Sequence, residues 1–285
     1  MGIRRFSVGK WGSMLFALSF GTMVVQTVGL AQTPFSQAAY DTIAKNYVTE
    51  GRVAYPRLKA NRAELDQYVD SVGKVTQAEF DAWDDAGKIA FLLNAYNAIT
   101  LKIILDHQPI TKRSGGPASL IFPVNSVRQI PGAWDKITHM VLGRPTKLND
   151  IEHEILRKKF KEPRIHMALV CGAKGCPPLR SEAYDGQRLS EQLDDQARTF
   201  LSNPIKFRID REKNVVWLSQ IFQWFGGDFL KTFGKPEGFG KHSNIENACL
   251  AFVSRYLSAN DQAYLKEGNY RVKYLDYDWS LNEDV

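Results

Sequence analysis

Apolar residues recur at every third or fourth position in several stretches of the chain, and this spacing predicts helices. Weaker patterns of this kind cover residues 38–48, 62–72, 188–201, 224–233 and 245–256. The pattern is clearest over residues 86–105, where one helical face carries Ile89, Leu92, Leu93, Tyr96, Ile99 and Ile103. Because the 86–105 stretch is also the most apolar, we expect it to form a central, buried helix.

Short apolar or alternating runs bounded by turn residues predict strands between these helices. Residues 137–148 indicate a hairpin that turns at Gly143, and a helix capped by Asn149 or Asp150 should follow it. Further strands are expected over residues 165–170, 205–209, 215–218 and 270–275. The mixture predicts a compact α+β fold, helix-rich, with short strands and hairpins packed on the central buried helix.

The first 31 residues have the features of a secretory signal peptide. Basic residues come first, and they are followed by an apolar stretch over residues 14–25 that is short and interrupted by polar or small residues. We expect cleavage after Ala31, which leaves residues 32–285 as a single domain without a stable membrane anchor. The expected location is the periplasm or the exterior of a bacterial cell.

Composition narrows the classes of function. The formal net charge is +6, of which three charges belong to Arg4, Arg5 and Lys10. Elsewhere basic and acidic residues alternate, as over residues 208–213, so a nucleic-acid partner is not expected. The chain has three cysteines, too few for a disulfide scaffold, and Cys249 lies in an apolar helical pattern where we expect it to be buried.

Residues 164–178 carry the densest set of reactive side chains. His166, Cys171 and Cys176 surround a glycine-rich turn, and reactive groups on such turns often perform chemistry. An ordinary thiol is mostly protonated at neutral pH, so a nucleophilic Cys171 needs a nearby base. His153 and His166 are both candidates. If residues 165–170 form a strand, His166 and Cys171 face opposite sides, which favours His153. The amides of residues 172–176 are expected to stabilise an oxyanion.

Other polar residues have both a catalytic and a structural interpretation. Glu152 could orient an imidazole, but an acid in the first turn of a helix also suits the helix dipole. Asn94 and Asn97 could orient a histidine as well, although buried amides more often tie a helix to neighbouring loops. The residues expected to assist binding, or to favour the thiolate, are Arg157, Arg164, Lys174, Cys176, Trp224 and Asp228.

The leading hypothesis is a cysteine-dependent enzyme for acyl transfer or for amide or peptide hydrolysis, acting on a small molecule or peptide. It needs no cofactor. A disulfide between Cys171 and Cys176 would instead favour a non-catalytic binding module with a locked turn, or thiol–disulfide exchange. A zinc site built from His153, His166 and the two cysteines has suitable ligand types but irregular spacing, so we rank it lower.

The same motifs resemble the domain-of-unknown-function 547 family. The resemblance covers roughly residues 50–235 and rests on segments 91–98, 151–157, 164–169, 171–179 and 218–229. It implies an exported bacterial protein, but it implies no particular reaction. In plant-type relatives the positions matching Glu152, His153 and Cys171 recur, whereas the position of Cys176 need not be cysteine. The resemblance therefore favours Cys171 over a mechanism that needs both thiols.

Overall fold

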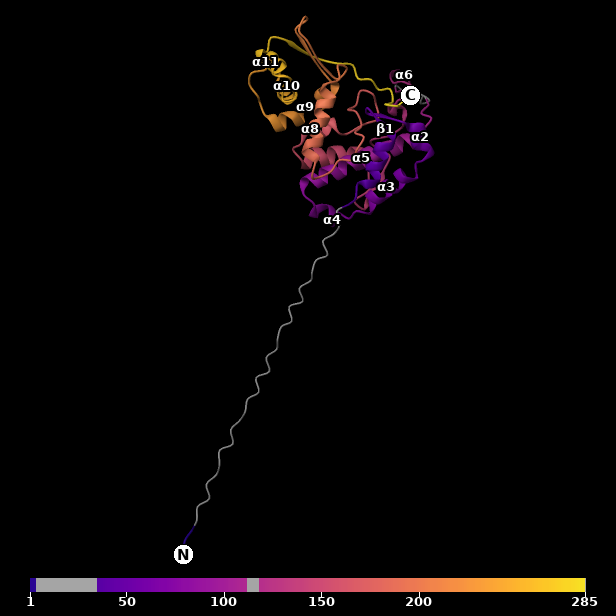
Figure 1. Cartoon of the computed structure of the whole chain (residues 1–285), viewed down its shortest axis with the longest axis vertical. Helices are drawn as coiled ribbons and strands as arrows, with labels where there is room; N and C mark the ends of the chain where they lie inside the picture. Colours follow the sequence, from indigo (N-terminus) through magenta and orange to yellow (C-terminus); the bar gives the residue numbers. More distant parts are fainter. Residues whose placement is uncertain (4–34, 112–117, 285) are drawn as a thin grey trace. The chain divides into compact units, whose positions relative to one another are not determined.

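The structure is a computed structural model that describes residues 1–3, 35–111 and 118–284 (Figure 1). The described residues from Phe35 onward form one compact unit. Apart from its first three residues, the expected signal segment lies outside the described residues, and so does the cleavage site after Ala31.

Helices account for most of the regular structure in the described residues. Each of the predicted helices is present, although α9 begins four residues earlier than expected because the Ser219 hydroxyl caps it by accepting a hydrogen bond from the amide of Ile221. Short helices without a repeated apolar spacing were missed. The α-helices are α1 (Ala38–Tyr47), α2 (Tyr55–Ala60), α3 (Ala63–Lys74), α4 (Gln77–Ala82), α5 (Asp85–His107), α6 (Ala118–Ile121), α7 (Arg157–Lys159), α8 (Leu189–Leu201), α9 (Gln220–Phe233), α10 (Asn244–Ser254) and α11 (Ala259–Glu267).

Helix α5 is the central helix that the sequence predicts. The Asp84 carboxylate caps its first turn by accepting from the amide of Gly87 at 2.7 Å. Nearly all side chains from Ile89 to Leu105 are buried on every face, which is why its apolar pattern is almost continuous. The helix is long and apolar enough to cross a membrane by composition alone, but here it lies within the protein and contacts α3 and α8.

The strands form small antiparallel hairpins and one mixed sheet. Both predicted hairpins and the last predicted strand are confirmed, and the first hairpin turns through Leu142 and Gly143, which both have positive φ. In the mixed sheet β5 pairs antiparallel with β6, and β6 pairs parallel with β7. The strands are β1 (Val48–Thr49), β2 (Arg52–Val53), β3 (His139–Val141), β4 (Arg144–Thr146), β5 (Phe207–Asp210), β6 (Val215–Leu218) and β7 (Arg271–Tyr274).

The predicted strand over residues 165–170 is wrong. Residues 163–167 form a short 3-10 helix, η3 (Pro163–Met167), whose first turn is capped by the Glu162 carboxylate. The chain that follows, residues 169–171, has no regular secondary structure. The side chain of Asn97 donates to the carbonyl of Ala168 and accepts from the amide of Val170, both at 3.0 Å. It thus supplies hydrogen bonds that a neighbouring strand would otherwise provide, and the alternation assumed for His166 and Cys171 does not apply.

The helix predicted after the first hairpin is present as a π-helix, η2 (Asp150–Leu156). Its expected caps differ. Asn149 stands at the N-cap position but makes no side-chain capping bond, whereas the carboxylate of Asp150 accepts from the preceding amide of Lys147. Because π-helical turns are wider than α-helical ones and often occur at functional sites, the conformation draws attention to the side chains of this segment.

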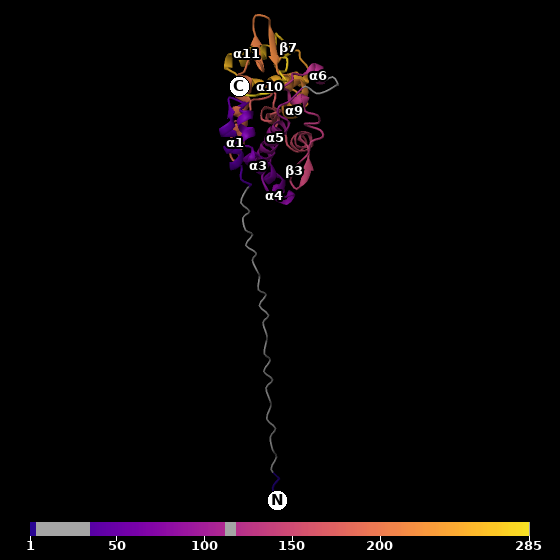
Figure 2. The ribbon, with the colours of Figure 1, turned by 90° about the vertical axis from the view of Figure 1, so that its right-hand side faces the viewer.

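Two hydrophobic clusters make up the core, and the C-terminal segment joins them. One cluster surrounds α5, and the other surrounds α9, α10 and the mixed sheet. Figure 2 shows α3 and α4 at one end of the domain, β7 and α11 at the other, and α5 between them. After β7 the chain crosses back toward the α5 half, where Asn282 donates to the carbonyl of Gly172 and Glu283 pairs with Val53 (Figure 1).

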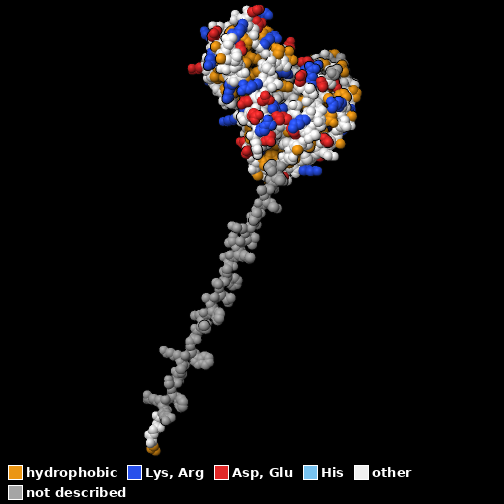
Figure 3. All heavy atoms as spheres, in the orientation of Figure 1, with side chains coloured by type: hydrophobic (Ala, Val, Ile, Leu, Met, Phe, Trp, Pro, Cys, Tyr) orange, Lys and Arg blue, Asp and Glu red, His pale blue; other side chains and the backbone are white. Residues whose placement is uncertain are grey.

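The surface has a mixed distribution of charge. On the face of the domain in Figure 3, Lys and Arg side chains lie among Asp and Glu side chains. Basic and acidic side chains of the domain also form ion pairs, such as Arg180 with Glu182 and Arg62 with Asp66. This distribution agrees with the alternating charges of the sequence and gives no electrostatic footprint for nucleic acid on this face.

Candidate functional site

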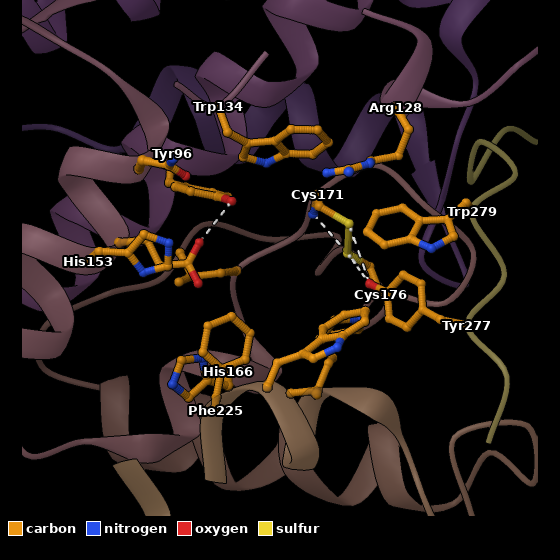
Figure 4. Close-up of a pocket in the computed structure, with 16 residues that line it drawn as sticks. Tyr96, Arg128, Trp134, His153, His166, Cys171, Cys176, Phe225, Tyr277 and Trp279 are labelled. Carbon is orange, nitrogen blue, oxygen red and sulfur yellow. Dashed lines mark hydrogen bonds between the residues drawn. A yellow bond between two sulfur atoms is a disulfide. The ribbon is translucent and has the colours of Figure 1, made fainter. Parts of the chain in front are cut away.

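A pocket of about 180 Å³ lies where the two hydrophobic clusters meet. It is large enough for one side chain or a small molecule, since an engineered cavity of roughly 150 Å³ holds benzene. Figure 4 shows the pocket with His153 on one side and the pair of cysteines on the other. The lining residues come from α5, residues 128–134, η2, η3, the 169–177 segment, α9 and the C-terminal segment. They include Tyr96, Arg128, Trp134, Glu152, His153, His166, Cys171, Cys176, Trp224, Phe225, Tyr277 and Trp279.

Cys171 and Cys176 form a disulfide at one wall of this pocket, with 6.2 Å between their Cα atoms. Cys171 is partly exposed, whereas only 4% of Cys176 is exposed. Glycines allow the tight turn between them. Gly172 has a φ of 84°, and a side chain at Gly175 would meet the ring of Tyr277 at 2.8 Å. Both cysteines therefore line the pocket, and Cys171 is the more exposed of the two residues.

The buried sulfur receives the better hydrogen bonds. Cys176 Sγ accepts from the backbone amide of Cys171 at 2.9 Å and from the hydroxyl of Tyr277 at 3.1 Å. The same hydroxyl lies 3.4 Å from Cys171 Sγ. Burial raises the pKa of Tyr277 well above its usual value, so its hydroxyl remains a proton donor. The two donors are placed to stabilise negative charge that develops on Cys176.

Three of the five turn amides expected to stabilise an oxyanion are already used by other backbone groups. Lys174 and Gly175 donate to the carbonyls of Ser280 and Asp278, each at 2.7 Å, and Cys176 donates to Ala173 at 3.1 Å. The C-terminal segment thus binds the turn along its backbone. This contact stabilises the disulfide turn, but it leaves these amides without a free N–H for a substrate oxygen.

A buried lysine supports the turn from the other side. Lys206 is 4% exposed, and its ammonium donates to the carbonyls of Lys174 and Cys176. Burial lowers the pKa of Lys206 to about 8. Since two turn carbonyls point at one ammonium group, Lys206 fixes the backbone beside the disulfide. The side chain of Lys174 itself does not line the pocket, contrary to its expected role in binding.

Glu152 lies in the pocket wall and is 7% exposed. Burial raises the pKa of its carboxyl to about 7, although the hydroxyl of Tyr96 donates to it at 3.2 Å (dashed in Figure 4). A carboxyl that titrates near neutrality can accept or release a proton under ordinary conditions. Its hydrogen bond goes to a tyrosine rather than to an imidazole, so the described contacts do not give Glu152 the orienting role expected from the sequence.

Both candidate histidines line the pocket, but neither is hydrogen-bonded to a cysteine sulfur in the described residues. His153 Nδ1 lies 3.0 Å from the guanidinium of Arg157, and His166 Nε2 lies 2.9 Å from the carboxylate of Asp228. Burial lowers the pKa of each imidazole, and for His153 the charge of Arg157 lowers it further. His166 also stacks on Phe225 with a centroid distance of 4.1 Å, as a core histidine would.

Asp228 links this histidine to a small charged network. Its carboxylate accepts from His166, Arg157 and Lys231. Burial opposes ionisation, but these three donors outweigh it and lower the pKa of Asp228 well below its usual value. Asp228 and Arg157 do not line the pocket of the disulfide, where they act through the imidazole that they hold in place, but together with His166 they line a neighbouring pocket of about 270 Å³.

The two asparagines of α5 bind backbone. Asn94 makes a reciprocal pair with Tyr184, donating to its carbonyl and accepting from its amide, each at 2.9 Å. Asn97 holds the segment that leads to Cys171, as described above. The structural interpretation of both amides is therefore confirmed, and neither contacts a histidine in the described residues. Arg164 pairs with Glu162 and Asp194 away from the pocket.

Aromatic residues that the sequence did not single out form much of the pocket wall. Trp224, which was expected, packs on Tyr277 and Trp279 with centroid distances of 4.8 and 5.9 Å. The latter two residues lie in the C-terminal segment, far from the cysteines in sequence. They reach the pocket because the chain crosses back after β7, and the sequence around them contains no pattern that would predict this position.

The remaining cysteine and the zinc hypothesis are also resolved by these positions. Cys249 is free and fully buried, and burial raises its pKa to about 12, which confirms that it acts as a core residue. Within residues 35–111 and 118–284, no three side chains of metal-binding type come together in a way that could hold a metal ion. The sulfurs of Cys171 and Cys176 are bonded to each other in this structure, so neither is a free thiolate ligand.

The fold and the pocket define a helix-rich α+β protein with a cystine in the wall of an aromatic cavity. Residues 80–201 match the family model described as a protein of unknown function, DUF547, which supports the resemblance seen in the motifs over that stretch. The match contains Glu152, His153 and both pocket cysteines but ends before Trp224 and the C-terminal aromatics. Comparisons with curated proteins and with solved structures gave no match.

Proposed function

We propose that this protein carries out thiol–disulfide exchange at the Cys171–Cys176 pair. The observation that carries the proposal is the asymmetry of the two sulfurs. Cys171 is partly exposed in a pocket that can admit a small thiol, whereas Cys176 is buried and accepts two hydrogen bonds. Exchange requires access to the attacked sulfur and stabilisation of the departing thiolate, and this pair supplies both.

The proposed reaction balances as two displacements. A substrate thiolate attacks Cys171 Sγ, a bond forms between them, and the Cys171–Cys176 bond breaks so that Cys176 leaves as a thiolate. A second substrate thiolate then attacks the substrate sulfur of this mixed disulfide and releases Cys171 as a thiolate. Two substrate thiols are oxidised to a disulfide while the protein disulfide is reduced, and the reverse sequence with another disulfide restores the oxidised protein.

Glu152 is the group best suited to manage protons in this pocket. An incoming thiol must lose its proton, and the departing Cys176 thiolate eventually gains one. A carboxyl with a pKa of about 7 serves both directions near neutral pH. Tyr277 stabilises the Cys176 thiolate by hydrogen bonding without giving up its proton, since burial raises its pKa.

Cysteine-dependent acyl transfer or amide hydrolysis is the second candidate. It is favoured by the presence of Cys171 and the titratable Glu152 in one pocket. This reaction starts from the reduced protein and needs only Cys171 as the nucleophile, with Glu152 or His153 as the base. The two candidates differ in their requirement for Cys176, and an experiment can separate them on that basis.

We also propose that the protein is exported and acts in the periplasm or outside the cell. The N-terminal sequence pattern supports export, and the disulfide supports an oxidising compartment, because cytosolic thiols are normally kept reduced. An intracellular location of the processed chain in a fractionation experiment would contradict this part of the proposal.

The test measures how fast a self-quenched disulfide peptide is reduced when glutathione is the reductant. It compares the protein comprising residues 32–285 with three variants of it. Exchange predicts that Cys171→Ser and Cys176→Ser each lower turnover at least about tenfold, whereas Cys249→Ala, a change at the free buried cysteine, leaves it unchanged. Full disulfide turnover by Cys176→Ser would overturn the proposal. Hydrolysis of an amide library that survives Cys176→Ser but not Cys171→Ser would establish the second candidate instead.

A further inference from the structure

We propose that Arg128 forms a carboxylate-binding subsite of the pocket, so that the preferred substrates are thiols or disulfides that carry a carboxylate close to sulfur. The inference rests on the proposed exchange function and adds a substrate class to it. Arg128 lines the same pocket as Cys171, and Figure 4 shows its guanidinium on the side of the pocket where the disulfide lies.

Aromatic rings hold the Arg128 guanidinium in place. Its Cζ lies 4.8 Å from the ring centroid of Phe122, 5.1 Å from that of Trp279 and 5.7 Å from that of Trp134. Ring faces attract the cation but do not occupy its N–H donors. Its N–H donors make no hydrogen bond to another side chain or carbonyl in residues 35–111 and 118–284, so they remain free for an anion as far as these residues show.

The charge of Arg128 has no carboxylate partner among the described residues. Other arginines near the core do: Arg157 pairs with Asp228, and Arg164 pairs with Glu162 and Asp194. An arginine in a pocket wall without an acid beside it attracts an anionic ligand, and its planar donors match a carboxylate in a bidentate arrangement. Arg128 is exposed, so its guanidinium is accessible to a ligand that enters from solvent.

Backbone contacts connect Arg128 to the disulfide turn. The amide of Arg128 donates to the Ser126 hydroxyl at 3.2 Å, which fixes the start of η1 (Val127–Gln129). The neighbouring carbonyl of Asn125 accepts from Leu281 at 3.0 Å, and the next amide, that of Asn282, donates to Gly172 at 2.9 Å. The C-terminal segment therefore joins the Arg128 segment to the cysteine turn and positions Trp279 between them.

The first arm of the test uses two disulfides of the same length, dithiodipropionate and its bis-amide. With glutathione as the reductant, we expect wild-type protein to reduce the disulfide of the dicarboxylate with a kcat/KM on the order of tenfold to a hundredfold above that for the bis-amide, as a charged hydrogen-bonded pair predicts. Arg128→Gln should bring this ratio close to one. Arg144→Gln is the matched control, because Arg144 is an exposed arginine on β4 away from the pocket, and it should preserve the ratio.

The second arm separates this inference from the exchange function. The Cys171→Ser/Cys176→Ser protein cannot exchange disulfides, and tryptophan fluorescence can follow its binding of thiodipropionate, a thioether dicarboxylate. Binding that Arg128→Gln abolishes and Arg144→Gln preserves supports the subsite even if no exchange is found. A wild-type ratio near one, or equal losses in the two arginine variants, overturns the subsite while leaving the exchange proposal to its own test.

Discussion

Replacing Glu152 by glutamine should change how stability depends on pH. In the folded protein burial raises the pKa of this carboxyl from 4.5 to about 7. As pH rises from the lower value to the higher one, the unfolded chain loses the proton before the folded protein does. The folded state binds more protons in that interval, so stability falls as pH rises. At 1.36 kcal/mol per pH unit, the loss contributed by Glu152 is roughly 3 kcal/mol.

Glutamine at position 152 keeps an oxygen that can accept from Tyr96 but cannot ionise. The stability of Glu152→Gln relative to wild type should therefore increase by roughly 3 kcal/mol between about pH 4 and about pH 8. Urea unfolding of the oxidised protein at a series of pH values measures this difference. Effects of the histidines are common to both proteins and largely cancel.

The matched control for this experiment is Glu154→Gln. Glu154 lies on the same π-helix but is exposed and pairs with Lys158, so its replacement should leave the pH dependence close to that of wild type. If the stability curves of Glu152→Gln and wild type run parallel across the whole range, Glu152 is not a buried carboxyl with a raised pKa, and its proposed role in proton transfer fails with it.

Three further substitutions test other parts of the site. Tyr277→Phe removes a donor to Cys176 Sγ and should slow reduction of the disulfide by a small dithiol about tenfold, measured by stopped flow; an unchanged rate would contradict thiolate stabilisation. Asn97→Ala leaves the carbonyl and amide that flank Leu169 without their partner, and thermal or urea unfolding should show a loss of about 2–4 kcal/mol. Asp228→Asn should lower the free energy of unfolding by about 2–4 kcal/mol at neutral pH. Because the pKa of Asp228 is lowered in the folded state, this loss relative to wild type should shrink as pH falls below the usual carboxyl range. If Asp228→Asn lost the same free energy of unfolding at neutral pH and below the usual carboxyl range, the ionic role of Asp228 would be refuted.

The helices that the sequence predicts are those whose apolar spacing matches their buried face. Helix α5 is the clearest case, since its residues from Ile89 to Leu105 are buried and its spacing is unmistakable. Short helices such as α2 and α4 bury only one or two large side chains. With so few buried positions no period can be recognised, and local sequence alone does not distinguish them from loops.

The segment before Cys171 shows why one strand was predicted wrongly. The apolar residues of this segment are buried, and a buried apolar run is compatible with either a strand or a helix. They are Ile165, Met167, Leu169 and Val170. The choice is made by Asn97, which binds the backbone on either side of Leu169 from a helix about seventy positions earlier. A tertiary hydrogen bond of this kind leaves no periodic signal in the segment it holds.

Only part of the candidate site could be predicted from the sequence, because tertiary structure brings some of its residues together. Glu152, His153, His166, Cys171 and Cys176 cluster in sequence and line one pocket. Tyr277 and Trp279 reach the pocket through the chain crossing after β7, where Trp279 packs on Arg128 from the earlier η1 segment. The same crossing uses the amides of Lys174 and Gly175, two of those expected to bind an oxyanion. Residues brought in by long-range topology, rather than by local chemistry, are the ones that sequence reasoning missed.

The central claim is that a thiol attacks Cys171 and displaces Cys176. The most direct measurement treats oxidised residues 32–285 with limiting glutathione, quenches with acid, and maps the mixed disulfide by peptide mass spectrometry. Attack at the partly exposed sulfur predicts an adduct on Cys171, with Cys176 recovered as a free thiol. An adduct on Cys176, or a disulfide that stays intact in the folded protein while it opens readily in urea, would contradict the claim.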